Sequence, residues 1–218
     1  MKKNVGRVLM VIGALLILGA LGLMAYNQWD ASRADKASQE ALGKLEETLT
    51  ETITEQQADS SAAALAPQPE LDPEQEMTEA EVDGWNYIGY LSIPSAGLQL
   101  PIMSEWSYPG LKIAPGRYSG TTYADNLVLC GHNYAKHFSP IKWLELGTAV
   151  YFTDMDGLRW SYEVSSVETL QPTQIEKMTT KTEDTEDWDL TLFTCTTGGS
   201  ARYAVRCVRT GYPTRVTE

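Results

Sequence analysis

An uncharged stretch from Val8 to Trp29 limits what this chain can fold into more than any other feature of its sequence. As a helix rising about 1.5 Å per residue it would be about 33 Å long, enough to cross a hydrocarbon core of about 30 Å. A cleaved signal peptide would have a shorter apolar core and a cleavage site between small residues. This stretch ends instead in Tyr26-Asn27-Gln28-Trp29, whose aromatic rings suit a membrane interface. We therefore expect residues 8–29 to form an uncleaved, single-pass transmembrane anchor.

Charge is distributed unevenly along the 218 residues, which carry a net charge of −12. Lys2, Lys3 and Arg7 precede the apolar stretch, whereas residues 30–83 hold most of the excess of acids. Because basic residues stay on the cytoplasmic side of a membrane, we expect residues 1–7 inside the cell and the rest outside. No segment has the clustered basic residues of a nucleic-acid interface, which argues against a nucleic-acid partner.

Residues 30–83 have the composition of a stalk, and we expect an acidic helix followed by a linker. Apolar residues recur at four-residue spacing and form a narrow stripe: Ala37, Ala41, Leu45, Leu49 and Ile53. Such a stripe could pair with another helix, lie on the following domain or belong to a lone stalk helix. From Asp59 to Asp83, prolines, alanines and acids replace the stripe, which is typical of a solvated linker.

The remaining residues, 84–218, predict a mainly β domain. The runs rich in β-branched and aromatic residues are Tyr87–Ile93, Leu98–Ile102, Asn126–Gly131, Ala149–Thr153, Arg159–Thr169, Leu190–Cys195 and Arg202–Thr210. A hairpin turn is expected at Asp154–Gly157, and short helical turns within Phe138–Leu146 and Pro172–Met178. Many short strands at close spacing favour a small β-barrel or a β-sandwich.

The ends of these strands carry side chains suited to nucleophilic catalysis. Cys195 ends one run, and Arg202 opens the next one after a turn with two adjacent glycines. His132 directly follows the run that ends at Gly131. A thiol, a guanidinium and an imidazole at strand ends form an arrangement that can activate a cysteine nucleophile.

Four segments resemble the sortase family, in the family's order. Thr191-Leu192-Phe193-Thr194-Cys195 matches the sortase pattern Thr-Leu-x-Thr-Cys, and Gly131-His132-Asn133 matches its histidine segment. Arg202 matches the arginine that opens the strand after the cysteine, and Tyr87–Pro94 is similar to the opening strand. The resemblance covers residues 84–212 and implies a closed β-barrel of about eight strands with short helices.

The resemblance implies a role for each of these residues. Cys195 would be the nucleophile, and His132 would give a proton to the leaving amine and take one from the incoming amine. Arg202 would hold the substrate carbonyl and offset the charge on its oxygen. Without the motif, Cys195 would fit a buried strand cysteine and His132 a loop histidine bonded to backbone.

Two further residues have weaker roles. Thr194 would shape the oxyanion site through its hydroxyl or its backbone, although a threonine also suits a strand without any catalytic task. Asn133 would orient His132. His137 is the rival base, and we expect it to pack near the site or to be solvated.

The activity that the resemblance implies is that of a membrane-anchored extracellular cysteine transpeptidase without a cofactor. It would cleave a sorting signal similar to Leu-Pro-x-Thr-Gly in surface proteins and form a thioacyl enzyme. The acyl group would then pass to an amine of a cell-wall precursor or of a pilin lysine. Two alternatives stay open: a cysteine hydrolase of cell-wall peptides, and a non-catalytic extracellular binding module on a stalk.

The other two cysteines, Cys130 and Cys207, lie in hydrophobic runs and are expected to be buried and inert, with a disulfide between them left open. No cysteine pair has metal-ligand spacing, so we expect no metal site. Asp72-Pro73 is followed by Glu74 and not by an aromatic residue, and the tail Thr210–Glu218 is polar. Both features favour an N-terminally anchored sortase of the class B or D type over a lidded pilin type.

The family's variable substrate-recognition loop would correspond to Gln171–Asp189 in this chain, just before the cysteine strand. The loop between Cys195 and Arg202 is short compared with that of many sortases. A short loop narrows this side of the groove, which leaves the preferred sorting signal open.

Overall fold

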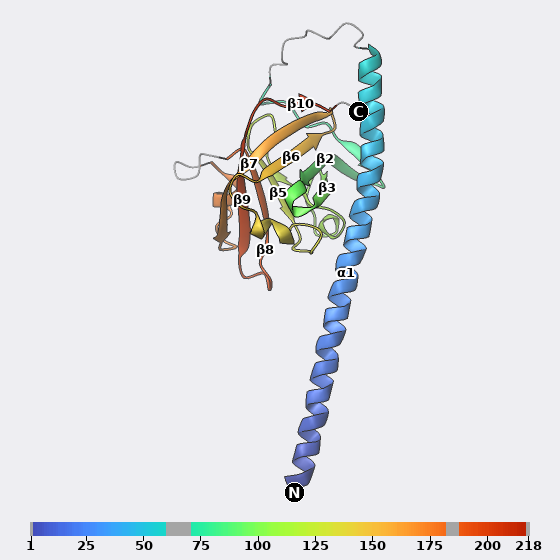
Figure 1. Ribbon diagram of the computed structural model, residues 1–218, viewed down its shortest axis with the longest axis vertical. Helices are drawn as coiled ribbons and strands as arrows, with labels where there is room; N and C mark the ends of the chain where they lie inside the picture. The colour runs from blue at the N-terminus through green and yellow to red at the C-terminus, as the bar shows by residue number, and fades with distance from the viewer. Residues whose placement is uncertain (1, 60–70, 182–187, 217–218) are drawn as a thin grey trace.

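The computed structural model describes residues 2–59, 71–181 and 188–216, with side chains placed from Gly6 to Thr54 and throughout the two later ranges. Most of the first half of the expected linker, 60–70, and residues 182–187 of the expected recognition loop lie outside the described residues. The molecule has two parts, a long helix α1 (Lys2–Asp59) and a β-barrel beside its second half (Figure 1).

Eight strands close the barrel, because each pairs with the next and the last returns to the first. In this order they are β2 (Trp85–Ile93), β3 (Leu98–Met103), β4 (Gly116–Ser119), β5 (Leu127–Gly131), β8 (Leu190–Cys195), β9 (Arg202–Arg209), β7 (Leu158–Leu170) and β6 (Ala149–Asp154). Two short strands extend the sheet: β1 (Ala80–Val82) pairs with β2, and β10 (Thr214–Arg215) with β7. The structure confirms the mainly β fold with a closed barrel.

Every strand expected from the sequence is present, and three more were not expected: β1, β4 and β10. The expected hairpin turn joins β6 to β7, where the Asp154 carboxylate accepts the backbone N–H groups of Asp156 and Leu158. The expected helical turns are a 3₁₀ helix at Ser139–Trp143 and the single-turn helix α2 (Glu176–Thr179). Two further 3₁₀ turns lie at Pro94–Ala96 and Gly110–Lys112.

Strand alternation decides which side chains of β8 face the core and which face outward. Leu190 and Leu192 are fully buried among the aromatic and aliphatic side chains inside the barrel. Thr191, Phe193 and Cys195 therefore lie on the outer face. The nucleophile expected from the sequence is thus on the outside of a rigid wall, at the end of its strand.

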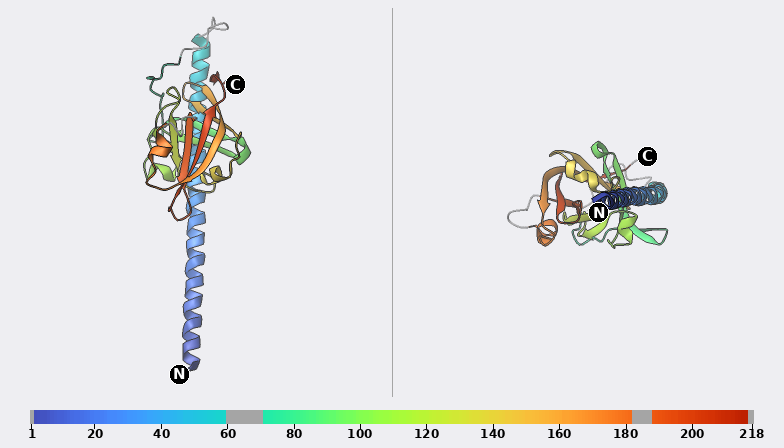
Figure 2. Two further views of the ribbon diagram at one scale, coloured as in Figure 1. Left: turned by 90° about the vertical axis from the view of Figure 1, so that its left-hand side faces the viewer. Right: turned by 90° about the horizontal axis from the view of Figure 1, so that it is seen from below.

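The second half of α1 packs against the barrel, while the first half stands free (Figures 1 and 2). Ala41, Leu45 and Leu49 of the expected stripe are buried against β1, β2 and β3, with Tyr87 and Met103 among their neighbours. Of the three alternatives for this stripe, the structure shows it lying on the domain. The apolar window near the N-terminus has a mean hydropathy of 2.7 and is not buried at all, so this helix is a candidate membrane span.

Leu45 gives a direct measure of how firmly α1 is held, because its side chain is fully buried between helix and barrel. In a fragment of residues 30–218, Leu45→Ala should lower the free energy of unfolding by about 2–4 kcal/mol. Glu47→Ala removes an exposed side chain two residues away and should change it by less than about 0.5 kcal/mol. Urea unfolding of both variants makes the comparison, and equal effects would show that α1 does not dock in solution.

Candidate functional site

Cys195 and Arg202 lie opposite each other, at the open end of the pair formed by β8 and β9. They are the last residues in the antiparallel register, so their side chains leave the same face of the sheet. The turn between them is held by a bond from the Thr196 amide to the Ala201 carbonyl, at 3.0 Å. The Arg202 Nη1 atom donates to the carbonyls of Gly199 and Ala201, at 3.1 and 3.0 Å. The Arg202 guanidinium is therefore held by the backbone of its own turn, beside the half-buried Cys195 thiol.

His132 reaches the same end of the barrel from the neighbouring strand. β5 runs parallel to β8, and their last register pair joins Gly131 to Thr194. His132 and Cys195 each follow that pair by one residue, which places them side by side. The buried Thr194 hydroxyl donates to the Gly131 carbonyl at 2.8 Å and so ties the two strand ends together. A side chain at position 131 would meet the Phe138 ring at 2.9 Å, so this strand end requires glycine.

The loop that carries His132 is attached to α1, which the sequence did not predict. The Tyr134 hydroxyl donates to Asp30 Oδ2 at 2.7 Å, and the Tyr134 and His132 rings are 5.2 Å apart. The hydrogen bond from Tyr134 and those from Arg33 lower the pKa of the Asp30 carboxyl, which favours its charged form. The first residue beyond the apolar stretch thereby supports the loop of the expected catalytic base.

The two histidines have different environments. His132 is half-buried, and burial lowers its pKa, an effect increased by Lys112 and opposed by Asp30. His137 is fully buried beside the Tyr134 ring, and burial lowers its pKa to about 4. A neutral, enclosed imidazole cannot exchange protons with a substrate outside the barrel, so His137 packs near the site and His132 is the more accessible of the two imidazoles. Asn133 is exposed.

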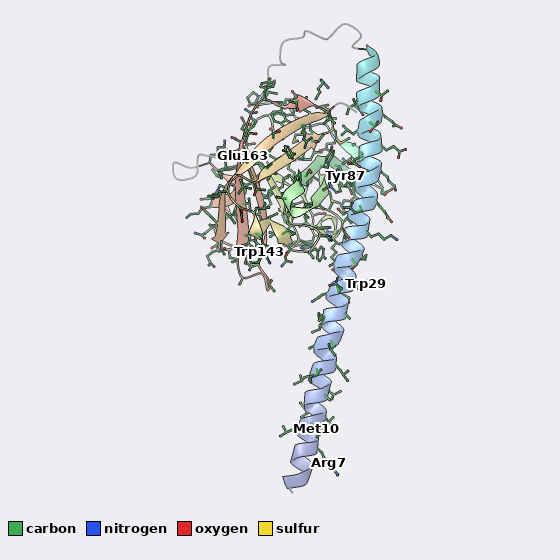
Figure 3. The ribbon with its side chains drawn as sticks, in the orientation of Figure 1. Arg7, Met10, Trp29, Tyr87, Trp143 and Glu163 are labelled. Atoms are coloured by element: carbon green, nitrogen blue, oxygen red, sulfur yellow. The ribbon has the colours of Figure 1, made fainter. Side chains whose placement is uncertain are left out.

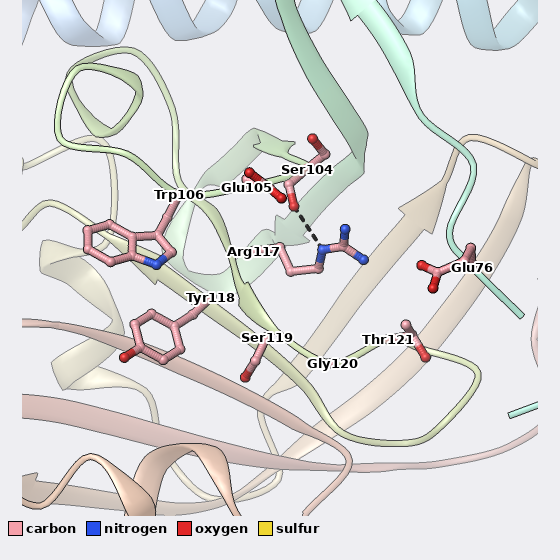
Figure 4. A pocket seen from close by; sticks show the side chains of 9 residues that line it. All are labelled: Glu76, Ser104, Glu105, Trp106, Arg117, Tyr118, Ser119, Gly120 and Thr121. Atoms are coloured by element: carbon pink, nitrogen blue, oxygen red, sulfur yellow. Dashed lines mark hydrogen bonds between the residues drawn. The ribbon is translucent and has the colours of Figure 1, made fainter. Parts of the chain in front are cut away.

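A row of aromatic side chains leads away from Cys195 over the outer face of the sheet. The Phe193 ring meets Tyr118 edge-on at 5.3 Å, and Tyr118 stacks on Trp106 at 5.7 Å. Figure 4 shows the Trp106 and Tyr118 rings on one side of β4 and the Arg117 side chain on the other, pointing toward Glu76. Residues of this region line an open pocket of about 480 Å³. The sequence did not indicate this row, because three separate segments contribute to it.

The other two thiols differ from Cys195 in their burial. All three cysteines are free, so Cys130 and Cys207 do not form the disulfide that the sequence left open. Cys130 and Cys207 are both buried, and burial raises the pKa of Cys130 to about 12 and that of Cys207 further still. Both side chains are therefore kept as neutral thiols, as expected from their hydrophobic runs.

Tyr134→Phe should show how much the contact with α1 contributes to the site. The substitution keeps the ring beside His132 and removes the hydrogen bond to Asp30, a bond to a charged group worth about 1.5–3 kcal/mol. We expect the rate of peptide acyl transfer to fall by roughly tenfold with little change in KM, because the loop loses its fixed position. Steady-state kinetics against pH supply the test, with Tyr108→Phe, an exposed tyrosine, as control. An unchanged rate and pH profile would mean that the contact plays no part in positioning His132.

Comparisons with known proteins relate this chain to sortases. A sortase A of Bacillus anthracis is 28% identical over 204 residues, covering 90% of this chain and 89% of that protein. A sortase A of Staphylococcus aureus (strain NCTC 8325 / PS 47) is 25% identical over 207 residues, with 89% of each chain covered. The solved structure of a sortase C from Streptococcus pneumoniae shares the fold, with a TM-score of 0.55 at 23% identity over 81% of this chain and all of that one.

The family model for the sortase domain matches residues 91–211, a range that runs from β2 past the end of β9. That range contains the cysteine, histidine and arginine strand ends described above. Sortases are cysteine transpeptidases, and the relatives and similar solved structures carry class names A, C, D and E, so the subclass of this chain stays a prediction. By this match over more than half of its length, together with its barrel, the chain belongs to the sortase family.

Proposed function

We propose that this protein is a membrane-anchored sortase that acts outside the cell on a sorting signal similar to Leu-Pro-x-Thr-Gly, with Cys195, His132 and Arg202 as its catalytic residues. One observation carries the proposal. The register pairs Cys195 with Arg202 across β8 and β9, and the parallel pairing of β5 with β8 puts His132 beside them. Two pairings of one sheet thereby bring a thiol, an imidazole and a guanidinium to one edge, which supports their assignment as nucleophile, acid–base group and anion-stabilising group.

The reaction proceeds in two acyl transfers. The Cys195 thiol passes its proton to His132 as the sulfur attacks the threonine carbonyl carbon, and the carbon–nitrogen bond to glycine then breaks as His132 gives that proton to the departing amine. Arg202 leaves its own turn and donates to the carbonyl oxygen while that oxygen carries negative charge. In the second half an incoming amine attacks the thioester, His132 takes its proton, and the Cys195 thiolate departs. The amine belongs to a cell-wall precursor or to a pilin lysine.

The aromatic row supports a peptide substrate. Phe193 lies on the face of β8 that carries Cys195, and Tyr118 and Trp106 continue that surface outward. Partly exposed aromatic rings bind apolar peptide side chains through burial of area and offer little competition for backbone hydrogen bonds. The apolar residue of a sorting signal would bind along this row while its threonine carbonyl reaches Cys195.

The test uses the full-length protein in detergent micelles with a library of sorting peptides and varied amines, read by mass spectrometry. We expect cleavage after threonine and a product in which the amine has replaced glycine. A product formed only with water would replace this proposal with a peptide hydrolase. Peptide binding without any product would replace it with a binding module.

Tyr118→Ala should weaken substrate binding, because it removes the central ring of the row. We expect KM for the sorting peptide to rise about tenfold, equivalent to about 1.4 kcal/mol, with kcat largely kept. Tyr151→Ala is the matched control, since this tyrosine lies on β6 and stacks on Arg159. Equal KM values for Tyr118→Ala and the wild type would place the peptide elsewhere.

A further inference from the structure

The catalytic end of the barrel lies where α1 leaves its apolar segment. α1 is one continuous helix, and Asp30, the first residue after that segment, is bonded to Tyr134 in the His132 loop at 2.7 Å. Figures 1 and 2 show the turn between β8 and β9 at the end of the barrel that points toward the N-terminus of α1. In Figure 3, Trp143 lies on this end, near the level that Trp29 occupies on the helix. A membrane around residues 8–29 would therefore have its surface next to the catalytic residues.

The side chains exposed at this end are of the kind found at membrane surfaces. Trp143 is 78% exposed although it belongs to a 3₁₀ helix packed on the barrel. The Lys142 ammonium lies 5.2 Å from its ring, and Lys136 is exposed in the His132 loop. Lys112 is exposed and close enough to act on the charges of both His132 and Asp30. Tryptophan with lysine suits a headgroup layer, and lysine side chains are attracted to an anionic surface.

The location of these lysines stands out against the charge of the whole chain. The protein carries a net charge of −12, and most of its excess acid lies in residues 30–83. At the catalytic end, the Asp30 carboxylate is paired with Arg33 at 3.0 Å, which leaves the lysines uncompensated by that acid. Glu145 is exposed two residues beyond Trp143 and opposes this charge, but the three lysines outnumber it, so an anionic surface is attracted to this end more than to the rest of the molecule.

We infer that the catalytic end of the barrel rests on the anionic headgroup layer at the extracellular surface of the cell membrane. This end is formed by the turn between β8 and β9 together with Trp143, Lys142, Lys136 and Lys112. The inference rests on the proposed membrane anchoring and adds an orientation to it. Docking of α1 fixes the barrel relative to the span, and the tryptophan and lysines hold the contact. Cys195 then lies beside the headgroups and away from bulk solvent.

A spin label measures this contact in the intact protein. Ser200→Cys, an exposed residue of the turn, is labelled with a nitroxide in a Cys195→Ala background, where Cys130 and Cys207 are buried and stay unlabelled. The protein is reconstituted into vesicles of phosphatidylcholine and phosphatidylglycerol. Thr214→Cys on β10, at the far end of the barrel, is the matched control. We expect a water-soluble nickel chelate to reach the label at 200 several-fold less often than the label at 214. Equal access at both positions would overturn the inference.

A helix insertion then separates the orientation from the activity. Seven alanines between Trp29 and Asp30 lift the barrel by about 10 Å and turn it by about two full turns, so its facing is nearly kept. The bond between Asp30 and Tyr134 lies beyond the insertion and is unaffected. We expect the label at 200 to become as accessible as the label at 214, whereas transfer from a soluble peptide to a soluble amine stays at the wild-type rate in the unlabelled enzyme.

Access to the spin label and transfer of the soluble peptide test the orientation and the proposed function separately. Protection at 200 that survives the insertion would show that the membrane is not what covers this turn, and the inference would fail while the sortase activity stands. Absence of soluble transfer in the parent protein would refute the proposed function, whatever the labels report. Trp143→Ala, outside the catalytic residues, should raise access to the label at 200, and an unchanged value would remove Trp143 from the contact.

Discussion

Cys195→Ala is expected to abolish acyl transfer, lowering the rate by at least about 10⁴-fold while the barrel stays folded. Of the three thiols, Cys195 is the one that is not buried, and it lies opposite Arg202 at the strand end. Without its sulfur no thioester can form, and the two-step exchange has no intermediate. Intact-mass spectrometry of the enzyme with a sorting peptide should show the acyl adduct on the wild type and none on the variant. His132→Ala should come close to the same loss.

Two cysteines of the same sheet and a nearby loop histidine are the controls for this prediction. Cys130→Ala and Cys207→Ala remove buried thiols whose raised pKa values keep them neutral, so transfer per folded molecule should persist. The His137→Gln variant should also keep its transfer activity, although losing the buried His137 ring lowers the stability of the protein. Cleavage by the Cys195→Ala protein, or a dead His137→Gln variant that is still folded, would show that the assignment of catalytic residues is wrong.

The parts of the fold that could be predicted from the sequence are those determined by neighbours in the chain. β8 and β9 form a hairpin joined by a short glycine turn, so the pairing of Cys195 with Arg202 follows from local sequence alone. β4 was missed because it spans only Gly116–Ser119 and is interrupted by an irregularity in its pairing with β5. Its strand character comes from partners on both sides and not from its own residues.

Contacts between distant segments could not be predicted from the pattern. The apolar stripe on α1 was evident from the sequence. The surface that covers it is formed by strands such as β2 and β3, and nothing in the sequence of these strands indicates that a helix packs on their outer face. The bond between Asp30 and Tyr134 joins residues 104 positions apart, and no spacing rule connects them. The acidic stalk was expected from the composition of residues 30–83, and composition does not tell whether a helix packs on the neighbouring domain.

Arg202→Lys is expected to reduce kcat by about 10²–10³-fold, the loss typical of removing a donor to an oxyanion. In the resting site one guanidinium nitrogen of Arg202, Nη1, donates to the carbonyls of both Gly199 and Ala201. A lysine keeps the positive charge beside Cys195 but has no planar pair of donors, so once it has left the turn it cannot hold the substrate oxygen in a fixed fork. Formation of the acyl enzyme in a single turnover should slow while KM changes little. Arg209→Lys, at the far end of β9 in an ion pair with Asp125, is the control and should keep its rate. If Arg202→Lys stayed within about threefold of the wild type, charge alone would suffice and the fork would have no part in the reaction.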